Sequence, residues 1–237
     1  MSGRLFAVGD VHGCAAELET LLAALPLATG DTVVFVGDYV DRGPDSARVI
    51  ELALDMARRT DVRTVCLRGN HEDMCLAYLG GPGHWADAWL DNGGRATLRS
   101  WGLDPATPAA EVAAAIPPAH RAFLDGLRRW HVTDAHLVVH AGIRPGRPLD
   151  AQDDEELYWI REPFLASTHG LPQTIVFGHT PYRDVFVDLP YKVGIDTGCV
   201  YGGMLTCLET TSGRLWQVRR GERHVVERPL PPSRRRA

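Results

Sequence analysis

Five short polar segments contain the residue types that bind metal ions and phosphate. The segments are residues 9–13 (GDVHG), 37–43 (GDYVDRG), 68–72 (RGNHE), 140–142 (HAG) and 178–181 (GHTP). Each segment follows an apolar run, at the point where a strand would end. Asp, Asn and His side chains together suit Mn, Fe or Zn, whereas Ca²⁺ prefers a set of oxygen ligands alone. The segments therefore predict a site for a transition metal or zinc.

The spacing of the candidate ligands predicts two metal ions. Asp10 and His12 are two residues apart, so both side chains can reach one ion from the same edge of an extended loop. Asp38 has two carboxylate oxygens and can bridge this ion to a second one. The ligands expected to complete the second site are Asn70, His140 and His179. Two ions about 3.5–4 Å apart hold a bridging hydroxide and clamp a phosphate for in-line attack, which predicts a phosphoesterase.

Charged residues beside these ligands suit the rest of that chemistry. The guanidinium of Arg42 or Arg68 can bind two phosphate oxygens at once. His71 follows a candidate ligand directly and is predicted to be the general acid that protonates the leaving alkoxide. Asp41 is expected to orient His71 and to favour its protonated form. These four residues are the predicted catalytic and phosphate-binding groups.

Strands alternating with helices are predicted to position the five segments. The expected strands are 5–8, 32–36, 62–67, 136–139 and 174–177, and the expected helices between the first three strands are 15–25 and 46–59. This alternation is typical of an α/β fold with a largely parallel sheet. Because the carboxyl ends of parallel strands point the same way, the side chains that follow them are expected to meet in one crevice.

Two stretches depart from this alternation. Residues 72–130 are mostly helical in pattern and are expected to form an insertion over one edge of the sheet. From residue 184 onward, short apolar runs separated by turns predict an antiparallel β layer. We expect a single domain over residues 1–228, followed by a disordered tail at 229–237 that is rich in proline and arginine.

The overall composition argues against several classes of protein, namely nucleic-acid-binding, secreted, membrane-spanning and disulfide-rich proteins. A net charge of -5 and a pI of about 6.0 predict no general attraction to nucleic acid. The N-terminus lacks the apolar stretch of a secretion signal, and no window approaches the roughly 20 apolar residues of a membrane span. The five cysteines include no C-x-x-C pair, so reduced thiols in a cytoplasmic protein are expected. Composition leaves the oligomeric state open.

In this order, the five segments resemble the pattern of the phosphoprotein phosphatase family within the calcineurin-like metallophosphoesterases. The resemblance covers residues 5–208, and the chain length is that of the compact bacterial and phage type. It implies an α/β fold built as a layered β-sandwich flanked by helices. It also implies two divalent metal ions, Mn²⁺ before Fe or Zn, and the removal of phosphate from phosphoserine or phosphothreonine in a phosphoprotein or phosphopeptide.

The resemblance implies a role for each matching residue. The implied ligands are Asp10, His12 and Asp38 for the first ion, and Asp38, Asn70, His140 and His179 for the second. The implied phosphate binders are Arg42 and Arg68, and the implied acid pair is His71 with Asp41. Residues 158–161 (YWIR) resemble the segment that supplies another phosphate-binding arginine in phage-type members, here Arg161. Residues 195–203 (IDTGCVYGG) resemble a late segment of bacterial members, where Tyr201 can line the crevice.

Two further functions compete with a protein phosphatase. One is hydrolysis of a dinucleotide such as diadenosine tetraphosphate. Symmetrically cleaving relatives typically carry Gln in place of His12 and often lack the carboxylate of Asp41, whereas asymmetrically cleaving relatives keep the histidine. The other is a catalytically inactive scaffold, which would have lost a ligand or His71. Since no ligand is lost, the sequence favours a protein phosphatase and keeps asymmetrical dinucleotide hydrolysis as the alternative.

Overall fold

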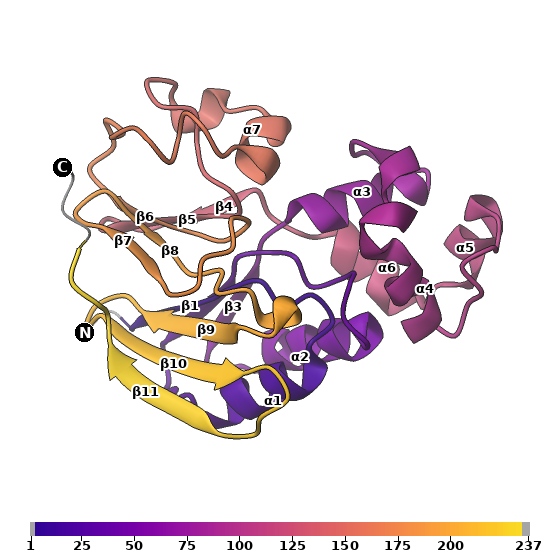
Figure 1. Cartoon of the computed structure of the whole chain (residues 1–237), viewed down its shortest axis with the longest axis horizontal. Coiled ribbons are helices and arrows are strands. Elements are labelled where there is room, and N and C mark those ends of the chain that lie inside the picture. Colours follow the sequence, from indigo (N-terminus) through magenta and orange to yellow (C-terminus); the bar gives the residue numbers. More distant parts are fainter. Residues whose placement is uncertain (1–2, 234–237) are drawn as a thin grey trace.

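Two β-sheets stacked face to face form the centre of the computed structural model, which describes residues 3–233 (Figure 1). The first sheet has the order β11-β10-β9-β1-β2-β3. Its parallel strands are β1 (Leu5–Val8), β2 (Thr32–Phe35) and β3 (Arg63–Cys66), and its antiparallel strands are β9 (Met204–Glu209), β10 (Arg214–Arg219) and β11 (Val225–Pro229).

The second sheet has the order β4-β5-β6-β8-β7. Its strands are β4 (Trp130–Val132), β5 (His136–Val139), β6 (Thr174–Phe177), β7 (Phe186–Asp188) and β8 (Lys192–Gly194). Strands β5, β6 and β8 run parallel to one another, while β4 and β7 pair antiparallel at the two edges. Both sheets are therefore mixed, since the parallel strands form one half of the first sheet and the centre of the second.

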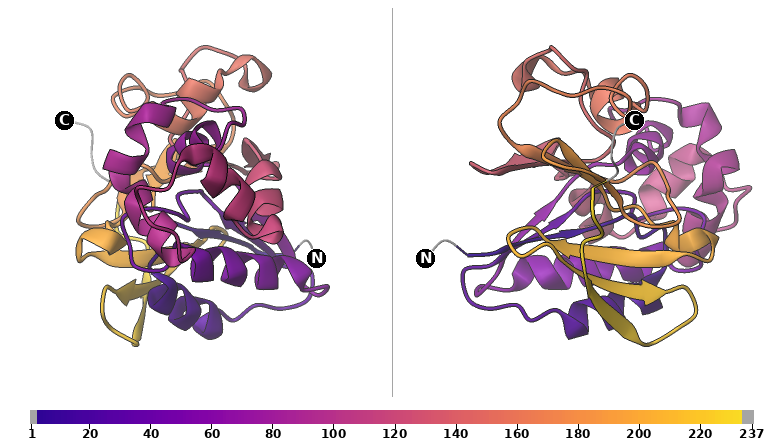
Figure 2. Two further views of the ribbon diagram at one scale, coloured as in Figure 1. Left: turned by 90° about the vertical axis from the view of Figure 1, so that its right-hand side faces the viewer. Right: turned by 60° about the vertical axis from the view of Figure 1, so that its left-hand side comes forward.

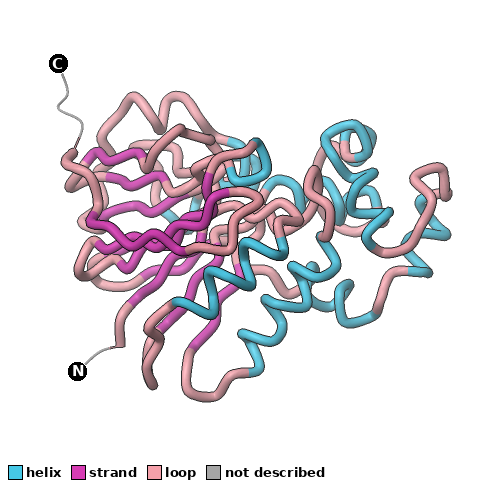
Figure 3. The backbone as a smooth tube through the Cα atoms, turned by 60° about the horizontal axis from the view of Figure 1, so that its bottom comes forward, coloured by secondary structure: helices cyan, strands magenta, loops and turns pink. Residues whose placement is uncertain are grey.

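Helices cover the outer faces of this sandwich. The helices α1 (Ala15–Ala24) and α2 (Ser46–Arg58) lie against the first sheet, as Figures 2 and 3 show, and α7 (Asp154–Trp159) packs on the second. The segment between β3 and β4 contains α3 (Asn70–Tyr78), α4 (Arg95–Ser100), α5 (Ala109–Ala115) and α6 (Pro118–Asp125). It also contains two short turns of helix, η1 (Ala86–Ala88) and η2 (Leu90–Gly94). These elements extend to one side of both sheets (Figure 1).

Alternation of side chains along the strands explains the layering. In β1, Leu5 and Ala7 face the second sheet, whereas Phe6 and Val8 face the helices of the first sheet. Successive side chains of a strand point to opposite faces, so a strand that is apolar at every position must be covered on both sides. All four residues of β1 are buried, as this layered arrangement requires.

The α/β class and the layered sandwich implied by the family resemblance are confirmed, whereas the largely parallel sheet expected from the strand–helix alternation is divided into two mixed sheets. The strands before His140 and His179, β5 and β6, belong to the second sheet. The late strands also divide between the sheets, since β9–β11 extend the first and β7 and β8 join the second. Apolar periodicity identifies a strand but carries no information about its partner, so the pattern alone could not separate the two sheets.

The end of the described chain is more regular than its composition predicted. Pro229 is the last residue of β11, and the amide of Leu230 donates to the carbonyl of Gly213 at 2.6 Å. The hydroxyl of Ser233 accepts from the amide of Leu189 at 3.0 Å. Residues 229–233 of the predicted disordered tail are thus attached to both sheets, and residues 234–237 lie outside the described residues.

Candidate metal centre

All six predicted metal ligands converge at the ends of five strand-to-loop connections. Asp10 and His12 follow β1, Asp38 follows β2, Asn70 begins α3 after β3, His140 follows β5 and His179 follows β6. All six residues are buried, each with 7% or less of its surface exposed. Three of the connections come from the first sheet and two from the second, so the centre lies where the two sheets meet.

Asp38 lies between two groups of histidines. Its Oδ2 atom is 3.3 Å from Nε2 of His12, and its Oδ1 atom is 3.4 Å from Nε2 of His140. Asn70 Oδ1 is 3.1 Å from His140 Nε2 and 2.9 Å from His179 Nδ1. Two groups of potential ligand atoms, each within 4.8 Å of one another, therefore share Asp38; they are His12 with Asp38 and His71, and Asp38 with His140 and His179.

The neutral state of two histidine rings makes this arrangement suitable for binding cations. Nδ1 of His12 donates to the carbonyl of Val40 at 2.9 Å, and Nδ1 of His140 donates to the carbonyl of Val36 at 3.0 Å. Burial lowers the pKa of His12 to about 3 and also lowers the pKa of His140, so both rings are neutral. The Nε2 lone pair of His140 then faces Oδ1 of Asp38, and that of His12 faces Oδ2 of Asp38 and accepts from Arg42. Buried acceptors that face each other in this way are suited to bind a cation between them.

Two atoms of the candidate ligands have no hydrogen-bond partner within the described protein. They are Oδ1 of Asp10 and Nε2 of His179, and both are buried. Burial raises the pKa of Asp10 well above its usual value, and the charges of Asp196 and Asp38 raise it further. Buried polar atoms nearly always have a hydrogen-bond partner or an ion to contact. Acceptors without a partner, beside clustered carboxylates, are therefore suited to bind cations. The residues present thus fit divalent metal ions.

The backbone is strained at three of the candidate ligands. His12, Asp38 and His179 have φ angles of 46°, 55° and 64°, in the left-handed region that residues other than glycine rarely adopt. Such residues cost about 1–3 kcal/mol each and cluster at functional sites. The neighbouring Gly178 leaves room for this packing, because a Cβ atom there would lie 2.0 Å from Oδ1 of Asp10.

His71, which belongs to the first of these two groups, forms a buried pair with Asp41. Nδ1 of His71 donates to Oδ2 of Asp41 at 2.6 Å, and both side chains are 1% exposed or less. Asp41 is held in turn by Nε1 of Trp89 at 3.0 Å and by the hydroxyl of Thr97 at 2.7 Å. Burial alone would lower the pKa of His71, but the charge of Asp38 and the bond to Asp41 outweigh it and raise the pKa. The protonated imidazole is therefore stabilised.

Trp89 and Thr97 have roles that sequence reasoning missed. Trp89 is part of the hydrophobic core, and its indole N–H also donates to Asp41. These residues lie 48 and 56 positions from Asp41 in the chain, and no spacing rule connects positions so far apart. The helical segment between β3 and β4 therefore takes part in building the site.

Glu72 holds the loop that carries Asp38. Its Oε2 accepts from the amides of Asp38 and Gly69 at 2.8 and 2.9 Å, and its Oε1 accepts from the amides of Tyr39 and Val40 at 2.8 and 3.2 Å. Glu72 is fully buried, and burial together with the charge of Asp38 raises its pKa. These contacts give Glu72 a supporting role, in which both of its carboxylate oxygens accept from backbone amides.

Glu72→Gln is expected to lower the free energy of unfolding by about 2–4 kcal/mol, because a side-chain N–H₂ would face two buried backbone N–H donors. Urea unfolding would measure the loss. Glu19→Gln is the matched control, since the side chain of Glu19 is 55% exposed and pairs only with Arg48 among the described contacts. Equal unfolding midpoints for the two variants would contradict the assigned role of Glu72.

A polar cavity of about 190 Å³ opens above these ligands. Its lining residues are Asp38, Arg42, Asn70, His71, Asn92, Trp159, Arg161, His179, Pro181, Asp196 and Tyr201. The guanidinium of Arg42 donates to Nε2 of His12 at 2.6 Å and lies over the ring of Tyr201, 5.6 Å from its centre. Arg161 is exposed at the opening. Two of the three predicted phosphate-binding arginines therefore line the cavity.

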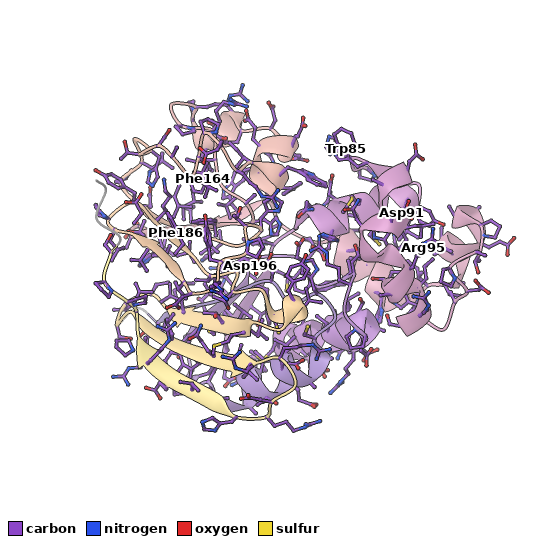
Figure 4. The ribbon with its side chains drawn as sticks, in the orientation of Figure 1. Trp85, Asp91, Arg95, Phe164, Phe186 and Asp196 are labelled. Carbon is purple, nitrogen blue, oxygen red and sulfur yellow. The ribbon has the colours of Figure 1, made fainter. Side chains whose placement is uncertain are left out.

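Arg68 lies outside the lining of this cavity. Its Nη1 atom is 3.9 Å from Oδ1 of the buried Asp73, and its Nε has no described partner. Asp196 was not among the predicted site residues, yet it is buried in the cavity wall at the centre of the molecule (Figure 4), where burial raises its pKa to about 6. Its position directly after an apolar run, like that of Asp10, was the signal that could have identified it.

Comparison with known proteins places this site in a family. A family model described as calcineurin-like phosphoesterase matches residues 3–196. The chain is 32% identical to serine/threonine-protein phosphatase 1 of Salmonella typhimurium, over 85% of this chain and 89% of that protein. It is 30% identical to an asymmetrical bis(5'-nucleosyl)-tetraphosphatase of Halalkalibacterium halodurans, over 85% of this chain and 87% of that protein.

Solved structures show the same fold. A crystal structure of a putative diadenosine tetraphosphatase is similar with a TM-score of 0.71 and 28% identity, covering 92% of this chain and 94% of that one. A cold-active protein-tyrosine phosphatase of a Shewanella species shares the fold with a TM-score of 0.61 and 18% identity, covering 96% of this chain and 80% of that one. The chain therefore belongs to the calcineurin-like phosphoesterase family and is a metal-dependent phosphoesterase, a hydrolase.

Proposed function

We propose that the protein hydrolyses phosphomonoesters, with phosphoserine and phosphothreonine of proteins as its substrates. The observation that carries this proposal is the buried pair of His71 and Asp41 beside the candidate metal ligands. A serine or threonine alkoxide is a poor leaving group and needs a proton as the bond to phosphorus breaks. When a phosphoanhydride bond of a dinucleotide is hydrolysed, the leaving group is the phosphate oxygen of a nucleotide, which needs that proton far less. A histidine held by a buried carboxylate therefore favours the phosphomonoester.

The family uses a dinuclear metal centre, and we propose the ligands of both ions in this chain. The proposed ligands are Asp10, His12 and Asp38 for one ion, and Asp38, Asn70, His140 and His179 for the other. Neutral imidazoles with carboxylate and amide oxygens suit Mn²⁺, the ion that we propose, and also Fe and Zn. When bound, such a pair of ions supplies a water-derived nucleophile at neutral pH and neutralises the charge of the phosphate.

Residues of the chain would bind the phosphate and protonate the leaving group. Arg42 and Arg161 line the cavity and would bind the phosphate oxygens, which orients the phosphorus atom for attack. Arg68 would join them by leaving Asp73, from which it is 3.9 Å away. His71 would donate its proton to the leaving oxygen, while Asp41 holds the imidazole through Nδ1 and leaves Nε2 directed to the substrate.

Asymmetrical hydrolysis of a dinucleotide is the alternative activity, and one feature of the cavity favours it. The ring of Trp159 lines the cavity and the ring of Tyr201, 62% exposed, lies at its edge. Flat aromatic faces of this kind can stack on a nucleobase. Relatives of this chain carry the names of both activities.

A substrate comparison after metal exchange would test the proposal. Treatment with EDTA is expected to abolish hydrolysis of para-nitrophenyl phosphate, and added Mn²⁺ to restore it. The restored protein is expected to hydrolyse a phosphoserine peptide with a kcat/KM at least about 10-fold above that for diadenosine tetraphosphate, a difference of about 1.4 kcal/mol in transition-state binding. A preference for the dinucleotide would establish the alternative, and hydrolysis that survives complete chelation would exclude both.

We also propose that the protein works in a reducing compartment such as the cytoplasm. All five cysteines are free, and Cys14, Cys75, Cys199 and Cys207 are buried. Within residues 3–233, no helix has both the length and the apolar character needed to cross a membrane.

A further inference from the structure

The only lysine of this chain is fully buried. Lysine and arginine together number 25, and every one of them except Lys192 is arginine. Lys192 begins β8 and has 0% of its surface exposed, although lysine is almost never completely buried without partners. A residue type that occurs once, at a position where it is costly, indicates a specific chemical requirement at that position.

The ammonium group of Lys192 forms hydrogen bonds to the loop that follows α7. It donates to the carbonyl of Phe164 at 2.8 Å and to the carbonyl of Ser167, and it lies 3.6 Å from the carboxylate of Asp188. Backbone carbonyls in an irregular segment have no neighbouring strand to pair with and need donors from elsewhere. A compact ammonium with three donors can serve oxygens in three directions, whereas the flat guanidinium of arginine cannot.

The turn that Lys192 holds also contains Arg161. The amide of Leu165 donates to the carbonyl of Arg161 at 2.9 Å, which closes a turn over residues 161–165. Phe164 lies within this turn and receives the bond from Lys192 through its carbonyl. The position of the Arg161 backbone is therefore coupled to the contact between Lys192 and Phe164.

Phe164 fixes the same turn against the strands that precede two proposed ligands. Its ring is fully buried and packs edge-on against Phe177 of β6, with centres 5.1 Å apart. It occupies the space beside Gly142, where a Cβ atom would lie 2.3 Å from the ring. Gly142 follows His140 by two residues, and Phe177 precedes His179 by two. The contacts of Phe164 therefore fix the position of the turn relative to both histidines.

We propose that Lys192 is a positioning residue for Arg161, holding its turn so that the guanidinium stays at the opening of the metal-site cavity. The proposal rests on the proposed function, in which Arg161 binds the phosphate of the substrate. Lys192 lies within the second sheet and does not line the cavity, so its effect passes through the backbone of the 161–167 turn.

Lys192→Met and Lys192→Arg would test this role in combination with Arg161→Ala. Methionine fills the volume without a donor, and arginine keeps the charge without the geometry. Each Lys192 variant is expected to raise KM for para-nitrophenyl phosphate about 10-fold and to change kcat less than about 3-fold, because ground-state binding of phosphate is what weakens. In the Arg161→Ala background the same changes are expected to alter KM less than about 2-fold, since coupled residues are not additive.

The rate of limited digestion with trypsin would report whether the turn stays closed, and it does not depend on an assay of enzyme activity. Cleavage after Arg161 is expected to become at least about 10-fold faster in Lys192→Met, because local opening of the turn exposes that bond. Cleavage after the exposed Arg183 serves as the internal control and should keep its rate.

The outcomes separate this proposal from the proposed function. If Lys192→Met raised KM equally with and without Arg161, or left cleavage after Arg161 unchanged, Lys192 would have only a general structural role and the proposal would be overturned. Failure of the unaltered protein to hydrolyse any phosphoester with Mn²⁺ would instead remove the proposed function. The trypsin result would still decide whether Lys192 holds the turn.

Discussion

Asp38→Asn is expected to remove both metal ions and to lower turnover of para-nitrophenyl phosphate by at least about 10²-fold. One carboxylate approaches both groups of ligands, with Oδ2 at 3.3 Å from His12 and Oδ1 at 3.4 Å from His140. The amide keeps only one oxygen, places an N–H₂ donor against the other group and removes the negative charge. Changes that only support a ligand already cost roughly 10–100-fold, so loss of a shared ligand should reach at least the upper end of that range.

Metal content per chain after dialysis, measured by mass spectrometry, would check this expectation beside the kinetic assay. Asp61→Asn is the matched control, because Asp61 is an exposed residue whose side chain pairs with Arg59 on the surface. Circular dichroism would establish that both variants are folded. Two ions per chain in Asp38→Asn would show that Asp38 does not bridge the sites.

His71→Ala is expected to lower kcat for a phosphoserine peptide by about 10²–10⁴-fold, the range that general acid catalysis contributes. For para-nitrophenyl phosphate the loss should be at most about 10-fold, because para-nitrophenolate leaves without a proton. The proposed ligands remain in place, so two metal ions should stay bound. Kinetics on both substrates, with metal analysis of the same samples, would measure the difference.

Two further variants test whether the effect of His71→Ala is specific to its role as the acid. Asp41→Asn should show the same dependence on the leaving group with a smaller loss, since it leaves the imidazole present but no longer stabilises its protonated form. His224→Ala, at an exposed position of the chain, should change neither substrate. Equal losses on the peptide and on para-nitrophenyl phosphate would exclude His71 as the acid.

Sequence reasoning went furthest where chemistry depends on residues that are close in the chain. Asp10 with His12, and His71 directly after Asn70, could be read as cooperating pairs because local backbone geometry limits how far such side chains can separate. The expectation that polar residues follow apolar strands also placed Asp38 correctly at the end of β2. These inferences required no knowledge of which strands are neighbours.

The same reasoning failed where a contact crosses the chain. The bonds of Trp89 and Thr97 to Asp41 and the turn of Arg68 toward Asp73 have no local signature. Each depends on how helices and sheets pack, and many packings are compatible with one apolar pattern. For the same reason, the prediction of a largely parallel sheet did not reveal that its strands divide between two mixed sheets.

By itself, then, the sequence determined which chemistry the chain can perform, since the types of ligand, acid and arginine are properties of individual residues and short spacings. Only the tertiary structure decided that two sheets supply the site, that a helical segment holds Asp41 and that one buried lysine bonds to the turn that contains Arg161. These are long-range contacts, whose geometry is set by the packing of whole elements rather than by the local backbone.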